Sequence, residues 1–384
     1  MTSGYDAFFG RAQCYVDGAW STPSGDPAAV VIDPFTEQPI GEVAEAGGPP
    51  VEKAILAATQ AQAAWAGLEL DTRLAVLERA ADTLDRDGAA LAATVTREMG
   101  MPVTLATATQ AHLPARVLRA AARTAREFPW RQAVPGATLL RRPAGAGAAI
   151  TPWNMPVYQI ILKLSAALAA GCTVVLKVSE MTPFDAMHLV GIFESAGCPA
   201  GVLNLVTGTG PVTGRQLVAD HRLRHVSFTG SVRGGRQVAA LAAANITRCT
   251  LELGGKAPSV ILPDADLAPV VRSALASGLV DPRSSPACHA TPARRGRRFS
   301  ARLWSSCPTA TRTTRRRWRT APTTGCPPRC TRPTATTRSV SPAAWTAGRS
   351  RSTACAPGTI RMCPSAASSS PATGASLAPS GWPR

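Results

Sequence analysis

Short β-type runs alternate with helical runs between residues 147 and 253. We expect strands at 147–151, 173–177, 202–207, 225–229 and 248–253, with helices at 157–170, 183–195, 212–219 and 234–244. Strands joined by helices of this length pair in parallel through right-handed crossovers. The pattern therefore predicts an α/β fold with a doubly wound parallel sheet, in which ligands bind at the carboxyl ends of the strands.

The flanking segments predict further parts of the chain. Residues 15–20 and the apolar run after them indicate a hairpin arm, and residues 51–97 carry helical periodicity up to the helix-stopping Gly100. Residues 257–262 predict a strand and residues 266–279 a helix, with Asp264 or Asp266 as its cap. We therefore predict three parts: a domain with its arm and helices at 1–255, a second, incomplete α/β domain at 256–280, and a tail at 281–384.

The charge of the chain is confined to its tail. The formal net charge is +17, but residues 1–280 contain 23 Lys plus Arg against 23 Asp plus Glu. Residues 281–384 contain 18 Arg, no Lys, and Asp281 as the only acid. Because periodicity also disappears there and Pro, Ser, Thr, Ala and Arg dominate, we predict a disordered tail.

Composition excludes several classes for the first 280 residues. Their content of Ala, Val, Leu and Ile suffices for a sizeable core, and no apolar run reaches membrane-spanning length. The N-terminus lacks the pattern of a signal peptide, so we expect a cytoplasmic protein. We expect no metal site, because the tail pair Cys326 and Cys330 lacks a second ligand pair and the body cysteines show no metal-type spacing: Cys14, Cys172, Cys198 and Cys249.

Three motifs stand at the ends of expected strands. Thr151-Pro-Trp-Asn154 follows the first strand, Phe228-Thr-Gly-Ser231 ends the fourth, and Leu251-Glu-Leu-Gly-Gly255 ends the fifth. A carboxylate between apolar residues, just before a Gly-Gly turn, suggests a general base. In this order and at these intervals, over about the first 280 residues, the motifs resemble the aldehyde dehydrogenase superfamily.

The resemblance implies oxidation of a small-molecule aldehyde to a carboxylic acid with NAD, or with NADP as the other candidate cofactor. Such chemistry needs a thiolate, donors for the oxyanion, a hydride acceptor and a base that activates water. Asn154 would supply the oxyanion donor. Glu252 would be the base, provided that desolvation raises its pKa. Intact relatives would be homo-oligomers, but this chain lacks their C-terminal oligomerisation strand, so we expect no normal assembly.

The resemblance also assigns the cofactor-binding residues. Lys177 and Glu180 emerge at a strand's carboxyl end and would grip the adenosine ribose, where a carboxylate favours NAD by repelling a 2′-phosphate and the lysine softens that preference. Gly230 and Ser231 open a helix whose amides and dipole favour a pyrophosphate. The expected cofactor-binding set is Trp153, Lys177, Glu180, Gly208, Gly230, Ser231 and Leu253.

The nucleophile of the family is missing. An Asn-x-Gly-Gln-x-Cys segment is expected some thirty residues after Glu252, but the cysteine position is occupied by Pro286. Cys288 lies two residues later, among residues that match nothing in the family motif. We therefore expect a catalytically defective chain whose cofactor domain is intact.

A shifted reading frame explains the tail. We joined the last base of each codon to the first two bases of the next and asked which residues the code permits. Residues 296–309 then permit E-E-I-F-G-P-V-V-V-V-L-P-Y, residues 321–326 permit T-D-Y-G-L, and residues 365–379 permit G-G-V-K-Q-S-G-Y-G-R-E-F-G-P. These resemble successive family segments in the correct order. We infer that a coding stretch with the nucleophile was lost near Val280 and that a frameshift followed.

Two alternatives belong to other classes. In the first, the chain is a nucleotide-binding scaffold whose arginine-rich tail binds nucleic acid. Electrostatics permits this, although no aromatic stacking platform accompanies the arginines. In the second alternative, the sequence is not made as a stable protein at all. Nucleic acid is the less favoured partner, because the neutral body offers no basic footprint.

The frameshift is tested by resequencing the gene across the codons for Ser277 to Arg298 from an independent template. Restored codons for the nucleophile segment and for E-E-I-F-G-P-V are expected if the tail is a sequencing error in an ordinary family member. The present bases, if reproduced, would instead make the chain a pseudoenzyme or a pseudogene product.

Overall fold

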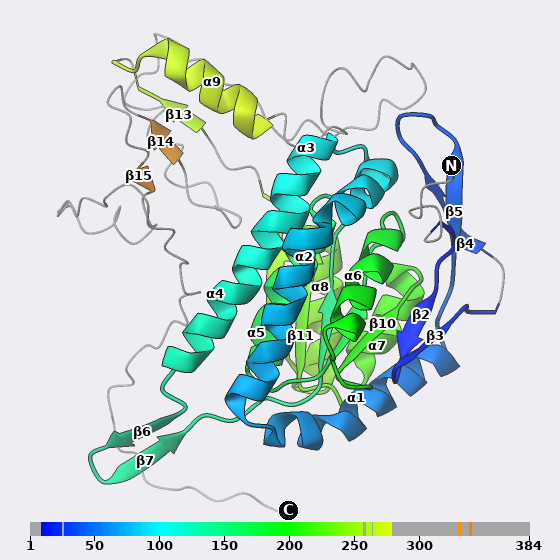
Figure 1. The fold of residues 1–384 in the computed structure, drawn as a ribbon, viewed down its shortest axis with the longest axis vertical. Helices are drawn as coiled ribbons and strands as arrows, with labels where there is room; N and C mark the ends of the chain where they lie inside the picture. The colour runs from blue at the N-terminus through cyan, green and yellow to red at the C-terminus, as the bar shows by residue number, and fades with distance from the viewer. Residues whose placement is uncertain are drawn as a thin grey trace, which may run out of the picture. The chain divides into compact units, whose positions relative to one another are not determined.

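The computed structural model describes residues 9–24, 27–255, 259–262, 264–278, 329–331 and 338–339. Its largest sheet has seven strands in the order β12-β11-β8-β9-β10-β2-β3. Figure 1 labels β2, β3, β10 and β11 of this sheet. Five of the seven strands are parallel neighbours: β8 (Gly147–Ile150), β9 (Val174–Lys177), β10 (Leu203–Val206), β11 (His225–Gly230) and β12 (Arg248–Leu253). The predicted parallel sheet is therefore confirmed.

A hairpin from the N-terminal arm extends the sheet. Strand β2 (Cys14–Val16) pairs antiparallel with β10, and β3 (Ala19–Ser21) pairs antiparallel with β2. Strands β1 (Gly10–Arg11), β5 (Pro39–Ala44) and β4 (Pro27–Ile32) form a separate sheet in that order. The arm thus contributes antiparallel strands to an otherwise parallel sheet.

The direction of winding reverses at β8. The chain runs from β8 to β9 and β10, and then returns to place β11 and β12 on the other side of β8. A reversal of this kind opens a crevice at the carboxyl ends of the two strands that flank it. The cleft expected for a ligand therefore lies between β8 and β11.

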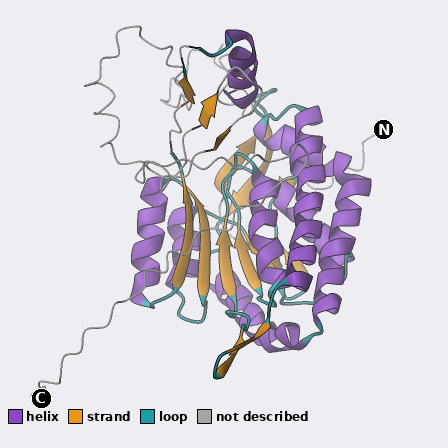
Figure 2. Cartoon of the chain, turned by 90° about the vertical axis from the view of Figure 1, so that its left-hand side faces the viewer, coloured by secondary structure: helices purple, strands orange, loops and turns teal. Residues whose placement is uncertain are grey.

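Helices cover both faces of the sheet, and Figure 2 shows the strands between two helical layers. One core cluster joins the sheet to α2 (Leu70–Met99), α4 (Leu113–Glu127), α5 (Pro156–Ala169) and α6 (Phe184–Ser195). The other joins it to α1 (Pro49–Gly67), α7 (Arg215–Ala219) and α8 (Val232–Ala244). A short π-helical turn, η3 (Gly210–Gly214), leads into α7.

The central strand β9 shows how the two cores arise. All four of its residues are buried, as expected for a parallel strand with both faces covered. Val174 and Leu176 belong to the α2 side, whereas Val175 belongs to the α1 side. Side chains alternate between the faces along a strand, so Lys177 leaves β9 on the same face as Val175.

Helix α2 is continuous from residue 70 to residue 99, through a glycine. A Cβ built on Gly88 would lie 2.5 Å from the Cβ of Ala111, which belongs to the π-helix η2 (Thr107–His112). Gly88 therefore permits η2 to approach α2 closely. Gly100 ends α2 in the left-handed conformation, with a φ of 78°, as the sequence predicted.

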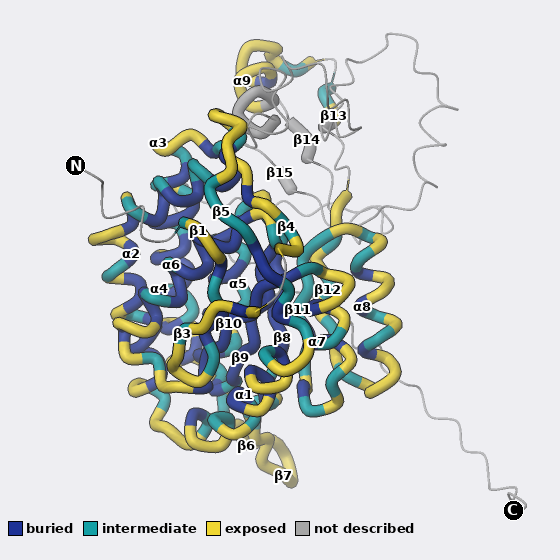
Figure 3. Tube along the Cα trace, turned by 90° about the vertical axis from the view of Figure 1, so that its right-hand side faces the viewer, coloured by how far each residue is buried: buried dark blue, intermediate teal, exposed yellow. Residues whose placement is uncertain are grey.

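Several elements were not predicted. Helices α3 (Val103–Ala106), η2 and α4 fill residues 103–127, and β6 (Arg131–Val134) pairs with β7 (Ala137–Leu140). For α4 a sequence signal was available, because its arginines recur at helical spacing opposite its buried residues. Every residue of the β6–β7 hairpin is exposed (Figure 3), so its strands lack the alternation of a half-buried sheet.

The predicted strand and helix after residue 256 are present as β13 (Ser259–Ile261) and α9 (Leu267–Gly278). Leu267 and Val271 of α9 are 65% and 53% exposed, consistent with an apolar face left uncovered. Two short strands are described within the tail. Strand β14 (Arg329–Thr331) pairs with β13, and β15 (Arg338–Ser339) pairs with β14. Backbone ladders need no apolar pattern, which explains why these strands left no sequence signal.

The other predictions for the tail fall outside the described residues. They include the position of Cys288 and the arginine-rich surface of the nucleic-acid alternative.

The contact at Gly88 predicts the sign of a stability change. Alanine normally stabilises a helix interior relative to glycine by about 0.5–1 kcal/mol. We expect Gly88→Ala to lower the free energy of unfolding instead, by about 1–3 kcal/mol, because its methyl group overlaps Ala111. Gly191→Ala in α6, where no atom lies within 4 Å of the added Cβ, should stabilise. Urea unfolding of both variants is the measurement, and a stabilised Gly88→Ala would contradict the close approach.

Candidate cofactor and catalytic site

The predicted site residues lie at one edge of the large sheet. Strand register places Ile150 beside Lys177 and Phe228 beside Ile150, and it places Thr229 beside Glu252. Because these strands are parallel, their carboxyl ends emerge together. The structure thus brings the Asn154, Lys177, Ser231 and Glu252 segments to the edge where doubly wound sheets bind ligands.

Lys177 and Glu180 form an ion pair at the end of β9. The ammonium nitrogen of Lys177 lies 3.2 Å from Oε2 of Glu180. The side chain of Lys177 is 3% exposed and that of Glu180 36%, so the carboxylate faces outward. Burial lowers the pKa of Lys177, and the charges of Glu180 and Glu45 partly offset this. The pair offers a donor and an acceptor side by side, as a sugar hydroxyl requires.

The turn that carries Trp153 and Asn154 is anchored on both sides. The amide of Thr151 donates to the carbonyl of Lys177 at 3.1 Å, and the amide of Tyr158 donates to Oε1 of Gln110 at 3.2 Å. Gln110 is fully buried in η2. Asn154 itself is exposed. The amide of Asn154 therefore sits on a supported turn, and Gln110 is a positioning residue that the sequence analysis missed.

Helix α8 begins at the carboxyl end of β11. Oγ of Ser231 accepts a hydrogen bond from the amide of Gly234 at 3.1 Å, so Ser231 caps the helix. The first amides of a helix have no intrahelical acceptor and carry its positive dipole end. Leu253 packs against α8 at Gly235, where a Cβ would overlap its side chain. Leu253 therefore contacts α8 from the edge strand.

At Gly208 and Gly230, the two predicted glycines of the site, an added Cβ would clash with a neighbouring side chain. A Cβ on Gly230 would lie 2.6 Å from the ring of Phe228. Gly208 has a φ of 123°, which side chains rarely adopt, and its Cβ would overlap the carboxylate of Glu45. Both glycines thus allow close approach of a neighbouring side chain. The structure describes these contacts, and the predicted contact of each glycine with cofactor stays a prediction.

Glu252 lies near a lysine that the sequence analysis missed. Nζ of Lys163, on α5, donates to Oγ of Ser227 at 3.0 Å and to Oγ1 of Thr229 at 2.8 Å. Burial lowers the pKa of Lys163 to about 8, against the opposing effect of the charge of Glu252. The signal was available, because Lys163 is the only charged residue in an otherwise apolar helix.

Glu252 itself is exposed on the edge strand β12. The expected role of general base depended on desolvation of the Glu252 carboxylate. The part of the chain that the structure describes does not supply that desolvation.

The four described cysteines do not supply a nucleophile at this edge. Burial raises the thiol pKa of Cys14 and of Cys249, and it raises that of Cys198 to about 12. A thiol with a raised pKa is protonated at neutral pH and is a poor nucleophile. Cys172 precedes β9 and so lies at the opposite edge of the sheet.

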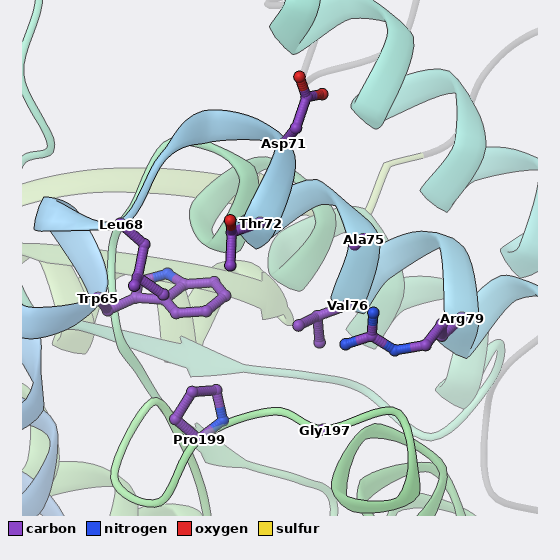
Figure 4. Close-up of a pocket in the computed structure, with 9 residues that line it drawn as sticks. All are labelled: Trp65, Leu68, Asp71, Thr72, Ala75, Val76, Arg79, Gly197 and Pro199. Atoms are coloured by element: carbon purple, nitrogen blue, oxygen red, sulfur yellow. The ribbon is translucent and has the colours of Figure 1, made fainter.

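A cavity of about 440 Å³ lies elsewhere (Figure 4). Its walls include Trp65 and Arg79, from α1 and α2, and Pro199 from the loop that enters β10 at its amino end. The cavity is therefore at the edge opposite to the predicted site, and it shares no residue with that site.

Two negative findings concern the described residues only. None of their helices is long and apolar enough to cross a membrane. Nor do they contain a group of three or more His, Cys, Asp and Glu side chains that could hold a metal ion.

Comparisons with known proteins agree with this geometry. The model of the aldehyde dehydrogenase family matches residues 20–281. A 3-succinoylsemialdehyde-pyridine dehydrogenase from a Pseudomonas species is 41% identical over 259 residues, which are 67% of this chain and 54% of the relative. The NADP-dependent succinate-semialdehyde dehydrogenase GabD of Escherichia coli is 36% identical, over 70% of this chain and 56% of its own.

Solved structures give the same result. Aldehyde dehydrogenase C of Pseudomonas syringae, in a mutant form with NAD⁺ and octanal, superposes with a TM-score of 0.67 at 39% identity. The match covers 69% of this chain and 55% of that structure. The chain spans little more than half the length of these relatives. Their motifs and their fold nevertheless extend over most of its described residues, and the chain belongs to the aldehyde dehydrogenase family.

Proposed function

We propose that this chain binds NAD(P) and descends from an enzyme that oxidises aldehydes to carboxylic acids, but cannot complete that reaction itself. The observation that carries the proposal is the convergence of four family motif segments at one edge of the parallel sheet. The names of the relatives, which act on succinate and glutarate semialdehydes, support a small semialdehyde as the ancestral substrate.

The residues at the edge suit a dinucleotide. Lys177 and Glu180 would hold the adenosine ribose, and the first turn of α8, behind Ser231, would face the pyrophosphate. Trp153, Gly208, Gly230 and Leu253 would complete the surroundings of the cofactor. When bound, the nicotinamide ring would accept a hydride from the substrate.

Asn154 and Glu252 would divide the remaining chemistry. The side-chain amide of Asn154 would donate to the carbonyl oxygen as negative charge develops there. Glu252 would take a proton from the water that attacks the acyl group. Their strands, β8 and β12, are separated only by β11, so their ends lie about 10 Å apart at the usual strand spacing. That separation leaves room for a small substrate between them.

The covalent step is the one that fails. The family motif would place a cysteine where Pro286 stands, and burial keeps three of the described thiols protonated. Without a thiolate, no covalent adduct forms from which hydride can leave. A cytoplasmic location and the loss of normal homo-oligomer assembly belong to the same proposal.

Separate assays of binding and turnover test this function. We expect the full-length chain to enhance NADH fluorescence on binding, yet to produce no NADH from NAD and succinate semialdehyde. Lys177→Met should weaken NADH binding about tenfold, because a buried ammonium that contacts the ribose is lost. Arg123→Met removes an exposed cation on α4 and is the matched control.

Two outcomes would contradict the proposal. Absence of NADH binding would remove the nucleotide-binding function altogether. Aldehyde turnover that Cys288→Ala abolishes would show that the chain has retained a nucleophile and is an active enzyme.

Lys163 predicts a pH dependence of stability. Its pKa is lowered to about 8 in the folded chain, so the unfolded chain binds more protons between pH 8 and about 10.4. The penalty for burying the ammonium is fully present below pH 8 and disappears as the pH rises through this window. We therefore expect Lys163→Met to stabilise the chain most below pH 8 and progressively less above it.

The measurement is the free energy of unfolding of both proteins in urea between pH 7 and pH 10. Taking the difference between the two proteins cancels the titration of the groups that they share. A difference between Lys163→Met and the unchanged chain that does not vary with pH would mean that Lys163 titrates normally.

A further inference from the structure

A carboxylate from the N-terminal arm is built into the turn that follows β10. Oε2 of Glu45 accepts a hydrogen bond from Oγ1 of Thr209 at 2.7 Å, and the amide of Thr209 lies 3.1 Å from both carboxylate oxygens. Oγ1 of Thr213 donates to Oε1 of Glu45. The next amide, that of Ala46, donates to the carbonyl of Thr207 at 3.3 Å. Glu45 is thus a fixed part of this turn.

The turn is shaped to admit that carboxylate. Gly208 has a φ of 123°, and a Cβ there would collide with Oε1 of Glu45 and with Oγ1 of Thr213. Burial alone would raise the pKa of Glu45, but the hydrogen bonds from Thr213 and Thr209 lower it further than burial raises it. Glu45 therefore carries its negative charge at neutral pH.

Sheet register places the strand that leads into this turn beside the strand that carries Lys177. Val206, at the end of β10, pairs with Lys177 at the end of β9. Lys177 leaves β9 on the same face as Val175, and Val175 and Ala46 belong to one core cluster. The charge of Glu45 acts on the ammonium of Lys177, as does that of Glu180. The ammonium of Lys177 consequently stands near two carboxylates.

The carboxylates of Glu45 and Glu180 bear on which of the two cofactors binds. NADP differs from NAD by a phosphate on the 2′-oxygen of the adenosine ribose, which adds up to two negative charges. Glu180 faces outward beside the ribose position, whereas Glu45 is held behind the Gly208 turn. Like charges at close range in a partly buried site repel strongly. Lys177 alone cannot offset both carboxylates and a phosphate.

We propose that Glu45 is a specificity residue of the cofactor site, whose fixed carboxylate disfavours a 2′-phosphate and thereby biases the chain toward NAD over NADP. The inference rests on the proposed nucleotide-binding function. It adds a residue from the N-terminal arm, 135 positions before Glu180, to the recognition of the adenosine end.

The test compares dissociation constants of NADH and NADPH for the full-length chain, measured by fluorescence titration. We expect NADH to bind more tightly than NADPH. Glu45→Gln keeps an oxygen acceptor but removes the charge, so it should reduce the NADPH/NADH ratio of dissociation constants about fivefold. Glu78→Gln is the control, because it removes an equal charge from an exposed ion pair on α2. Its ratio should be unchanged.

A second variant separates charge from local structure. Thr213→Val removes one hydrogen bond to Glu45 but leaves the carboxylate, so it should loosen the turn without a comparable change in the ratio. A ratio that is equal in Glu45→Gln and the unchanged chain would overturn the inference alone. An equal shift in Thr213→Val would also overturn it, since turn geometry would then set the preference. If neither nucleotide binds the unchanged chain, the proposed function fails and the inference fails with it.

Discussion

The parallel pairing of β8 with β9 on one side and β11 on the other is the constraint on which the site depends. Parallel pairing makes every carboxyl end emerge at one edge, and reversal of the winding at β8 opens that edge. The ends of β8 and β12, about 100 positions apart in the chain, thus emerge at one edge with only β11 between their strands. The pairing of the strands brings the motif segments to this edge, and it does not depend on contacts between the motif side chains.

The polar groups of the predicted site lie on two different faces of the sheet. Lys177 leaves β9 toward the α1 side, where Glu45 approaches from the arm. Thr229 and Glu252 are register partners and share a face, and Lys163 reaches that face from α5. Each face thus carries one lysine: Lys177, which is buried, on the α1 side, and Lys163, which is half-buried, on the α5 side. In each case burial lowers the lysine pKa and a nearby carboxylate opposes the shift.

The sequence predicted those parts of the fold that local pattern determines. Strand and helix alternation predicted the five parallel strands, and the motif segments lie at strand ends that share one edge, where cofactor binding stays a prediction. Gln110, Lys163 and Glu45 could not be placed in the site in this way, because each reaches it through a tertiary contact. Helix α4 is a different case, because its arginines recur at helical spacing opposite the buried face and the signal was available in the sequence.

The exposure of Glu252 follows from its position on the edge strand. Among the described residues β12 pairs only with β11, and Arg248, Thr250 and Glu252 are exposed along its uncovered face. A general base near neutrality requires desolvation, which a covering second domain would supply in intact relatives. The same cover would pair or shield the free edge of β12, which otherwise offers unpaired backbone groups to other chains. Loss of the catalytic half would therefore remove the environment of the base together with the nucleophile, and restoring a cysteine alone would not restore the reaction.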